Sequence, residues 1–135
     1  DTKLAPELSN EAHYYRAKAY LDAGKTDGAM EDLKILAKDT RNVYGAEAKY
    51  KVAQIYFDGG QTDKAEQEVL NYIEVSTPHT YWLARSFVLL ADVYMKSGRN
   101  LDAKQYLLSL KQNYQADDDI AGMIESRLEK LKTEN

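Results

Sequence analysis

One stretch of the chain, AQIYFDGGQTDKAEQEVL at residues 53–70, has two close copies elsewhere in the sequence. The copies are AKAYLDAGKTDGAMEDL at residues 17–33 and ADVYMKSGRNLDAKQYLL at residues 91–108. Each begins with an alanine and has a tyrosine three residues later. A glycine follows four residues after the tyrosine, a second alanine nine after it and an aliphatic residue thirteen after it. This fixed spacing indicates an internal structural repeat. The repeated positions are Ala17, Ala53 and Ala91; Tyr20, Tyr56 and Tyr94; Gly24, Gly60 and Gly98; Ala29, Ala65 and Ala103; Leu33, Val69 and Leu107.

Each copy predicts two helices joined by a tight turn. Small and apolar residues recur at helical spacing before the glycine, which supplies the left-handed conformation that ends the first helix. Thr26, Thr62 and Asn100 stand two residues after the glycines, where their side chains are expected to cap the second helix. Asp27 and Asp63 then place a negative charge in its first turn. The alternative, an unrelated helical bundle, does not demand a fixed repeat.

Over residues 10–115 this pattern resembles the tetratricopeptide repeat. The resemblance implies an all-α fold, a right-handed superhelical solenoid of three helix–turn–helix repeats plus a C-terminal capping helix. The chain departs from the family at the first large position (His13, Lys49, Phe87) and at the terminal proline position (Arg41, Thr77, Gln115). Its tyrosines are 36 and 38 residues apart, longer than the usual repeat. This lengthened form resembles tetratricopeptide proteins of bacterial cell envelopes, which implies a periplasmic or outer-membrane-associated location, with the cytoplasm as the alternative.

The repeats divide the chain into five predicted parts. These are an N-terminal link (1–9), repeat one (10–41), repeat two (42–77), repeat three (78–116) and a capping helix with its tail (117–135). Ser9 or Asn10 is expected to cap the first helix. The first ten residues resemble an inter-repeat link, and the chain begins without methionine, so we expect a piece excised from a longer solenoid or a mature chain.

The C-terminal segment predicts a helix that closes the solenoid. Three aspartates at 117–119 are expected to cap it and to favour its dipole. A calcium loop is the competing interpretation, but the alternating acidic positions, central glycine and distal glutamate are missing. The apolar stripe of this helix is Ile120, Ile124, Leu128 and Leu131, and the residues expected to face solvent are Glu125, Arg127 and Lys130.

Composition excludes several classes of function. The 135 residues are 44% hydrophobic and 30% charged, which argues against global disorder. The net charge of −4, with both signs interspersed, disfavours nucleic-acid binding. No apolar run approaches the roughly 20 residues that a transmembrane helix needs. The absence of cysteine excludes disulfides and thiolate metal sites.

In the family that the chain resembles, the first helices of successive repeats line a concave groove. On each of these helices the residues not needed for packing fall on one side. They mix tyrosines and apolar residues with both charge signs, which suits a bound peptide or helix of a partner protein. The competing interpretation is that Tyr14 and Tyr50 only pack against neighbouring helices while the charges are solvated. The candidate groove residues are Glu11, Tyr14, Lys18, Leu21 and Asp22; Glu47, Tyr50, Gln54, Phe57 and Asp58; Arg85, Val88, Asp92, Met95 and Lys96.

Two more specific binding roles, a clamp for a chaperone tail and a tryptophan anchor, have less support in the sequence. The set by which some family members clamp the carboxylate of a chaperone tail is not reproduced, because Tyr14, Lys18, Lys51, Arg85 and Leu89 occupy those places. Trp82 follows Pro78, which is expected in the first turn of a helix with Thr77 as its cap. We expect this lone tryptophan to fill space between repeats rather than to anchor a partner.

No motif nominates catalysis, a metal or a cofactor. His13 and His79 lie in different repeats without an acidic partner at helical spacing. Gly59 and Gly60 belong to the turn between helices, not to a phosphate-binding loop. The carboxylates fall on faces predicted to be solvated, where nothing raises a pKa for acid catalysis. We therefore predict a non-catalytic protein-interaction scaffold; the alternative is a structural segment of a longer solenoid that spaces or oligomerises other domains, with self-association possible.

Overall fold

The computed structural model describes residues 6–75 and 77–133 of the chain. This part contains seven α-helices and no strand. The helices are α1 (Pro6–Asp22), α2 (Thr26–Leu36), α3 (Val43–Asp58), α4 (Thr62–Glu74), α5 (Thr80–Lys96), α6 (Asn100–Asn113) and α7 (Ile120–Thr133). Residues 1–5, in the predicted N-terminal link, lie outside the described residues. None of the described helices combines the length and the apolar character that crossing a membrane requires.

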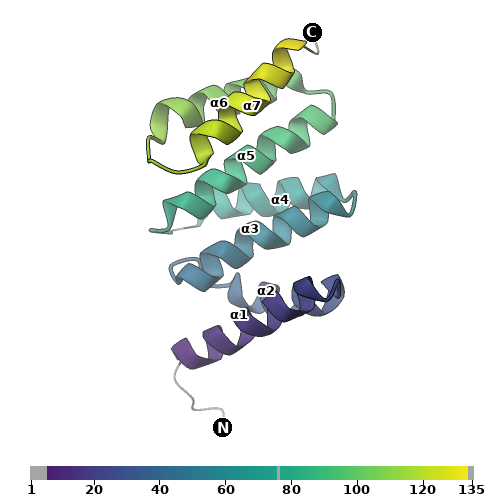
Figure 1. Cartoon of the computed structure of the whole chain (residues 1–135), viewed down its shortest axis with the longest axis vertical. Coiled ribbons are helices and arrows are strands. Elements are labelled where there is room, and N and C mark those ends of the chain that lie inside the picture. Colours follow the sequence, from purple (N-terminus) through teal and green to yellow (C-terminus); the bar gives the residue numbers. More distant parts are fainter. Residues whose placement is uncertain (1–5, 76, 134–135) are drawn as a thin grey trace.

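The helices form stacked antiparallel pairs. The pairs are α1 with α2, α3 with α4 and α5 with α6, and the second helix of each pair also packs against the helix that follows it. Figure 1 shows α1, α3, α5 and α7 above one another along the long axis, with α2, α4 and α6 in a layer behind them. The chain is therefore an all-α helical repeat solenoid, as the sequence predicts.

The repeated alanines lie where the paired helices cross. All six, one on each of the helices α1 to α6, are at most 1% exposed. A methyl group at a crossing lets two backbones approach closely, and the larger residues Leu33, Val69 and Leu107 fill the space beside it. The same positions recur in each pair because each pair solves the same packing problem.

The glycine turns also match the prediction. Gly24, Gly60 and Gly98 have φ values of 73°, 80° and 78°. In the first turn the Lys25 N–H donates to the Tyr20 carbonyl at 2.8 Å and the Gly24 N–H donates to the Leu21 carbonyl at 3.0 Å. This pair of bonds is the Schellman motif of a helix C-terminus, and the other two turns repeat its longer-range bond.

The predicted caps of the second helices are wrong by one residue. Thr26, Thr62 and Asn100 are the first residues of α2, α4 and α6, and the preceding residues, which occupy the cap positions, make no side-chain cap bond. The Schellman closure explains the shift. The residue after each glycine donates the bond that closes one helix and also occupies the cap position of the next. No further residue lies between the two helices that could supply a capping side chain.

The starts of two other helices differ from the prediction. Helix α1 begins at Pro6, so Ser9 and Asn10 lie inside it and cannot cap it. Helix α5 begins at Thr80, so Pro78 precedes its first turn and Thr77 is not its cap. At α7 the Asp118 carboxylate accepts a bond from the Ile120 N–H, the first of the helix, at 2.9 Å, so an aspartate of the predicted run bonds a free N–H from one residue before the cap position. The apolar stripe of α7 is confirmed, and its residues pack against the core.

Candidate partner-binding face

The candidate groove residues lie on the face formed by α1, α3, α5 and α7, which we call the first-helix face. Their exposure varies more than the sequence predicts. Tyr50 and Val88 are buried, at 6% and 3% exposed, and belong to the core. Glu11, Lys18, Asp22, Asp58 and Lys96 are exposed, and the others are partly buried. A partner can therefore reach only part of the predicted set.

The first tie across this face joins α1 to α3. The Tyr14 hydroxyl donates to the Glu47 carboxylate at 3.0 Å, and the Lys51 ammonium approaches the second oxygen of that carboxylate at 2.5 Å. The Tyr14 ring also packs against Tyr44, with their centroids 4.6 Å apart. Desolvation, followed by the nearby Glu47 charge, raises the pKa of Tyr14 to about 12, so its hydroxyl stays a donor.

The second tie joins α3 to α5 through an arginine. The Arg85 guanidinium donates to the hydroxyls of Tyr50 at 3.0 Å and Tyr81 at 2.9 Å, and its carbon lies 4.8 Å from the centre of the Tyr50 ring. The Tyr81 hydroxyl in turn donates to Asp119, just before α7. Trp82 packs beside Tyr50 and Tyr81, which confirms that it fills space between repeats.

The third tie joins α5 to α7. The Arg127 guanidinium makes two bonds to the Asp92 carboxylate, at 2.8 and 3.0 Å. Both side chains are about one quarter exposed. The prediction that Arg127 faces solvent is therefore wrong, because on this face it bridges neighbouring helices. Asp92 was predicted as a groove residue, and its oxygens are used inside the molecule.

An open hollow remains at one edge of the face, which we call the α3–α5–α7 hollow. Its volume is about 530 Å³. Phe57 comes from the last turn of α3, and Met95 and Lys96 come from the last turn of α5. The other lining residues are Asp92, Ser126, Arg127 and Lys130. Four of its seven lining residues belong to the candidate groove set; the three on α7 do not, because the sequence predicts only a capping role for this helix.

A buried carboxylate lies behind α1, where the sequence predicts only solvated acids. Asp32 of α2 is 1% exposed and accepts two bonds from Arg16, at 2.8 and 2.6 Å. The His13 Nδ1–H donates to the same carboxylate at 2.8 Å. The Arg16 bonds, more than those of His13, lower the pKa of Asp32, so the charge is held for structure rather than for acid catalysis.

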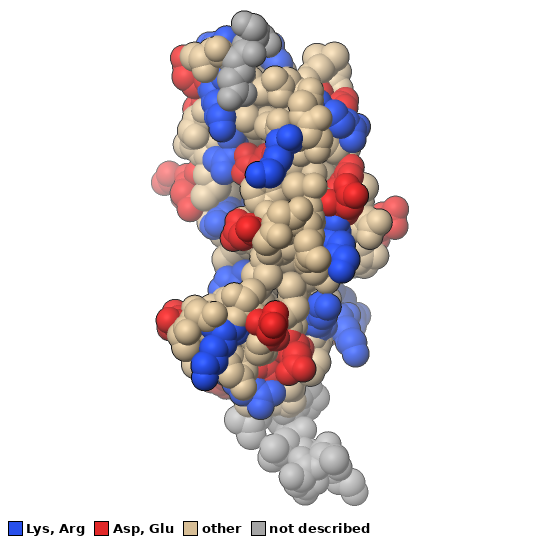
Figure 2. All heavy atoms as spheres, turned by 90° about the vertical axis from the view of Figure 1, so that its right-hand side faces the viewer, with Lys and Arg blue, Asp and Glu red and all other residues tan. Residues whose placement is uncertain are grey.

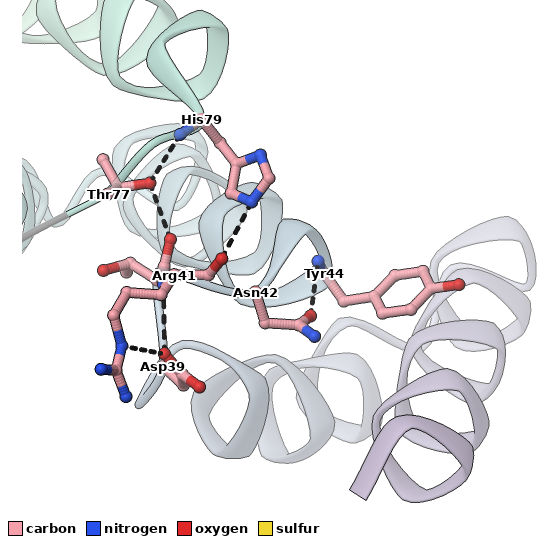
Figure 3. Close-up of polar contacts among 7 residues, drawn as sticks. Asp39, Arg41, Asn42, Tyr44, Thr77 and His79 are labelled. Carbon is pink, nitrogen blue, oxygen red and sulfur yellow. Dashed lines mark hydrogen bonds and ion pairs between the residues drawn. The ribbon is translucent and has the colours of Figure 1, made fainter.

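The links between repeats are joined to each other by hydrogen bonds (Figure 3). The Thr77 hydroxyl donates to the Thr40 carbonyl at 2.7 Å and accepts from the His79 N–H at 3.1 Å. The His79 Nε2–H donates to the Arg41 carbonyl at 3.0 Å. Thr77, predicted as a cap, therefore ties the link before α3 to the link before α5. Neither histidine lies in a described group of three or more side chains that could hold a metal.

A family model of the tetratricopeptide repeat matches residues 11–39. The match spans most of α1 and all of α2, and supports a tetratricopeptide repeat protein. Such repeats generally mediate interactions between proteins and are generally not catalytic. No curated protein and no solved structure matches the chain.

Proposed function

We propose that this chain is a non-catalytic interaction module that binds a segment of a partner protein on the first-helix face. The α3–α5–α7 hollow carries the proposal. Its volume of about 530 Å³ falls in the range of about 300–1,000 Å³ that is typical of binding pockets. Phe57 and Met95 offer partly exposed apolar surface in it, and polar groups surround them. A small apolar centre with a polar rim is the usual anatomy of a protein interface.

The hydrogen-bonded ties support this function indirectly. Each tie spans two successive helices of the face, so the spacing of α1, α3, α5 and α7 is set before a partner arrives. A preformed surface loses less conformational entropy on binding, which raises affinity for a given area. The bound segment is expected to be short, because the hollow is lined by only seven residues.

Peptide display tests the proposal without assuming a partner. Random peptides are selected on the intact chain and remeasured on Met95→Gln, which replaces a thioether in the hollow by an amide of similar shape. The matched control is Ile35→Gln on α2, at a side chain that is 46% exposed outside this face. We expect Met95→Gln to weaken binding by about tenfold and the control to leave it unchanged. Selected peptides that bind both variants as well as the original chain would refute a site on this face.

An alternative function is a structural segment of a longer or self-associating solenoid. It is supported by a hollow of about 360 Å³ between α6 and α7, where Leu101 is 70% exposed. Sedimentation of the intact chain and of Leu101→Gln measures this alternative. A dimer that the substitution dissociates supports it, and a monomer over the whole concentration range refutes self-association.

The repeat length supports a proposal about location. With tyrosines 36 and 38 residues apart, the chain resembles envelope-type repeat proteins of bacteria, so we propose the periplasm or the outer-membrane periphery. Fractionation of the source cells tests it, and recovery with cytoplasmic markers would refute it.

A further inference from the structure

We propose that the α3–α5–α7 hollow recognises an acidic protein segment with one apolar anchor residue. This inference rests on the proposed function and adds the chemistry of the partner. The apolar part of the hollow, Phe57 and Met95, fits the anchor. The charges around it select what flanks the anchor.

The hollow carries positive charge that the molecule leaves unneutralised. Its lining has three cations, Lys96, Arg127 and Lys130, and one anion, Asp92, which gives a formal excess of +2. Arg127 and Asp92 satisfy each other through their two bonds. Lys96 and Lys130 make no ion pair with the described residues, so both ammonium groups are available to an incoming carboxylate.

This excess runs against the charge of the whole chain. The net charge is −4, and Figure 2 shows acidic and basic side chains interspersed over one side of the molecule. The acid that follows Phe57 in the chain, Asp58, accepts a bond from Gln54 and does not line the hollow. Lys96 lies 6.0 Å from the centre of the Phe57 ring, which keeps its ammonium beside the apolar surface. Carboxylates next to an apolar side chain therefore complement the hollow, whereas a basic segment meets like charge.

The position of the lysines favours an acidic partner further. Lys96 ends α5, and Lys130 is in the last turn of α7, where a cation is also favourable to the helix dipole. The interaction of each lysine with the dipole of its own helix does not require the two lysines to line the same hollow. Both lysines line the same hollow as Phe57 and Met95, and this combination of charge and apolar surface is what the recognition of an apolar anchor beside carboxylates requires.

Three synthetic peptides test the proposal by fluorescence anisotropy on the intact chain. The first has one phenylalanine flanked by glutamates, the second has lysine for each glutamate, and the third has serine for the phenylalanine. We expect binding only of the first, weakening with salt because the charges are exposed. Equal binding of the acidic and basic peptides, or no loss on removing the phenylalanine, would overturn the proposal.

Charge-reversal variants locate the site. The double variant Lys96→Glu with Lys130→Glu is compared with Lys34→Glu with Lys38→Glu, which changes the net charge equally in a different hollow. We expect the first to weaken the acidic peptide by about tenfold or more and to bind the lysine peptide, and the second to do neither. Equal weakening by both pairs would show attraction to bulk charge and overturn the proposal.

The display experiment separates this inference from the function on which it rests. Selected peptides that depend on Met95 but lack acidic residues, and that bind the Lys96 and Lys130 variant normally, refute the acidic specificity and leave the binding face intact. Selected peptides insensitive to Met95→Gln refute the binding face itself.

Discussion

Replacing Gly45 by alanine should destabilise the solenoid, although alanine is the better helix former. Gly45 is buried in the first turn of α3, beside the end of α2. A Cβ atom there would lie 1.9 Å from the Asp39 carbonyl oxygen and 2.6 Å from the Leu36 carbonyl oxygen. Both are backbone atoms, so a rotamer change cannot relieve the overlap and the two helices must move apart.

Gly122 provides a matched control. Like Gly45 it is the third residue of its helix, but a Cβ atom there meets nothing within 4 Å. The intrinsic gain of alanine over glycine, at most about 1 kcal/mol, is therefore the same at both positions. Overpacking costs about 1–3 kcal/mol, and contact with fixed backbone belongs at the upper end. The free energy of unfolding should fall by about 2 kcal/mol for Gly45→Ala and rise by about 0.5 kcal/mol for Gly122→Ala.

Urea unfolding followed by circular dichroism measures both changes. The midpoints should move in opposite directions, and the slopes with urea should stay the same if each variant keeps a two-state transition. A Gly45→Ala variant as stable as the original chain would refute the close approach of α2 and α3. Loss of stability in both variants would refute the assumption that Gly122 faces open space.

Two further changes test the buried polar contacts. Asp32→Asn should lower the free energy of unfolding by about 2 kcal/mol at neutral pH, because it removes charge-assisted bonds to Arg16 and His13. The pKa of Asp32 in the folded state is depressed, so its contribution to stability is complete above the unfolded pKa of about 3.9 and is lost as the pH falls below that value. An equal difference in urea midpoint between Asp32→Asn and the original chain at pH values above and below this window would contradict the assignment. Arg85→Lys should cost about 1 kcal/mol, since an ammonium cannot bond both tyrosine hydroxyls in the fork geometry of the guanidinium, and an unchanged urea midpoint would show that the Tyr50 and Tyr81 contacts add nothing.

The helical hairpins could be predicted because the spacing of a few residues within each repeat determines them. Alanine, tyrosine and glycine at constant separations encode a helix crossing, a packing residue and a left-handed turn, all within one repeat. The caps were missed for a related reason. Spacing located the turn correctly, but it does not reveal that Lys25 serves both the end of α1 and the start of α2.

The buried Asp32 had a signal in the sequence that local reasoning passed over. His13 and Arg16 stand at positions where the repeat expects interior residues. Asp32, beside the repeated Leu33, is the buried charge, at 1% exposed, whereas the Arg16 side chain is 59% exposed. A buried charge without a partner costs roughly several kcal/mol, so two basic groups on the facing helix indicate an acid opposite them. A search for charge compensation between the two helices could have found it.

The candidate groove residues lie together on the first-helix face, but some of them are buried, because burial on this face depends on neighbouring repeats. A helical projection of α3 places Tyr50 on its free side, yet Arg85 and Trp82 of α5 cover it. The projection treats each helix alone, whereas the step between hairpins decides how much of one helix the next one hides. Val88 is buried for the same reason, within the core shared by α3 to α7.

The ties and the hollow divide the first-helix face into residues that hold its shape and residues that can meet a partner. The side chains of Tyr14, Arg85 and Arg127 donate hydrogen bonds to neighbouring helices, so replacing them should lower the free energy of unfolding more than it weakens binding. The ammonium groups of Lys96 and Lys130 make no ion pair with the described residues, so replacing these lysines should weaken binding and leave the free energy of unfolding within about 0.5 kcal/mol of its original value. If the two Lys variants unfold as easily as the tie variants, the lysines belong to the scaffold and the hollow has no free charge with which to select a partner.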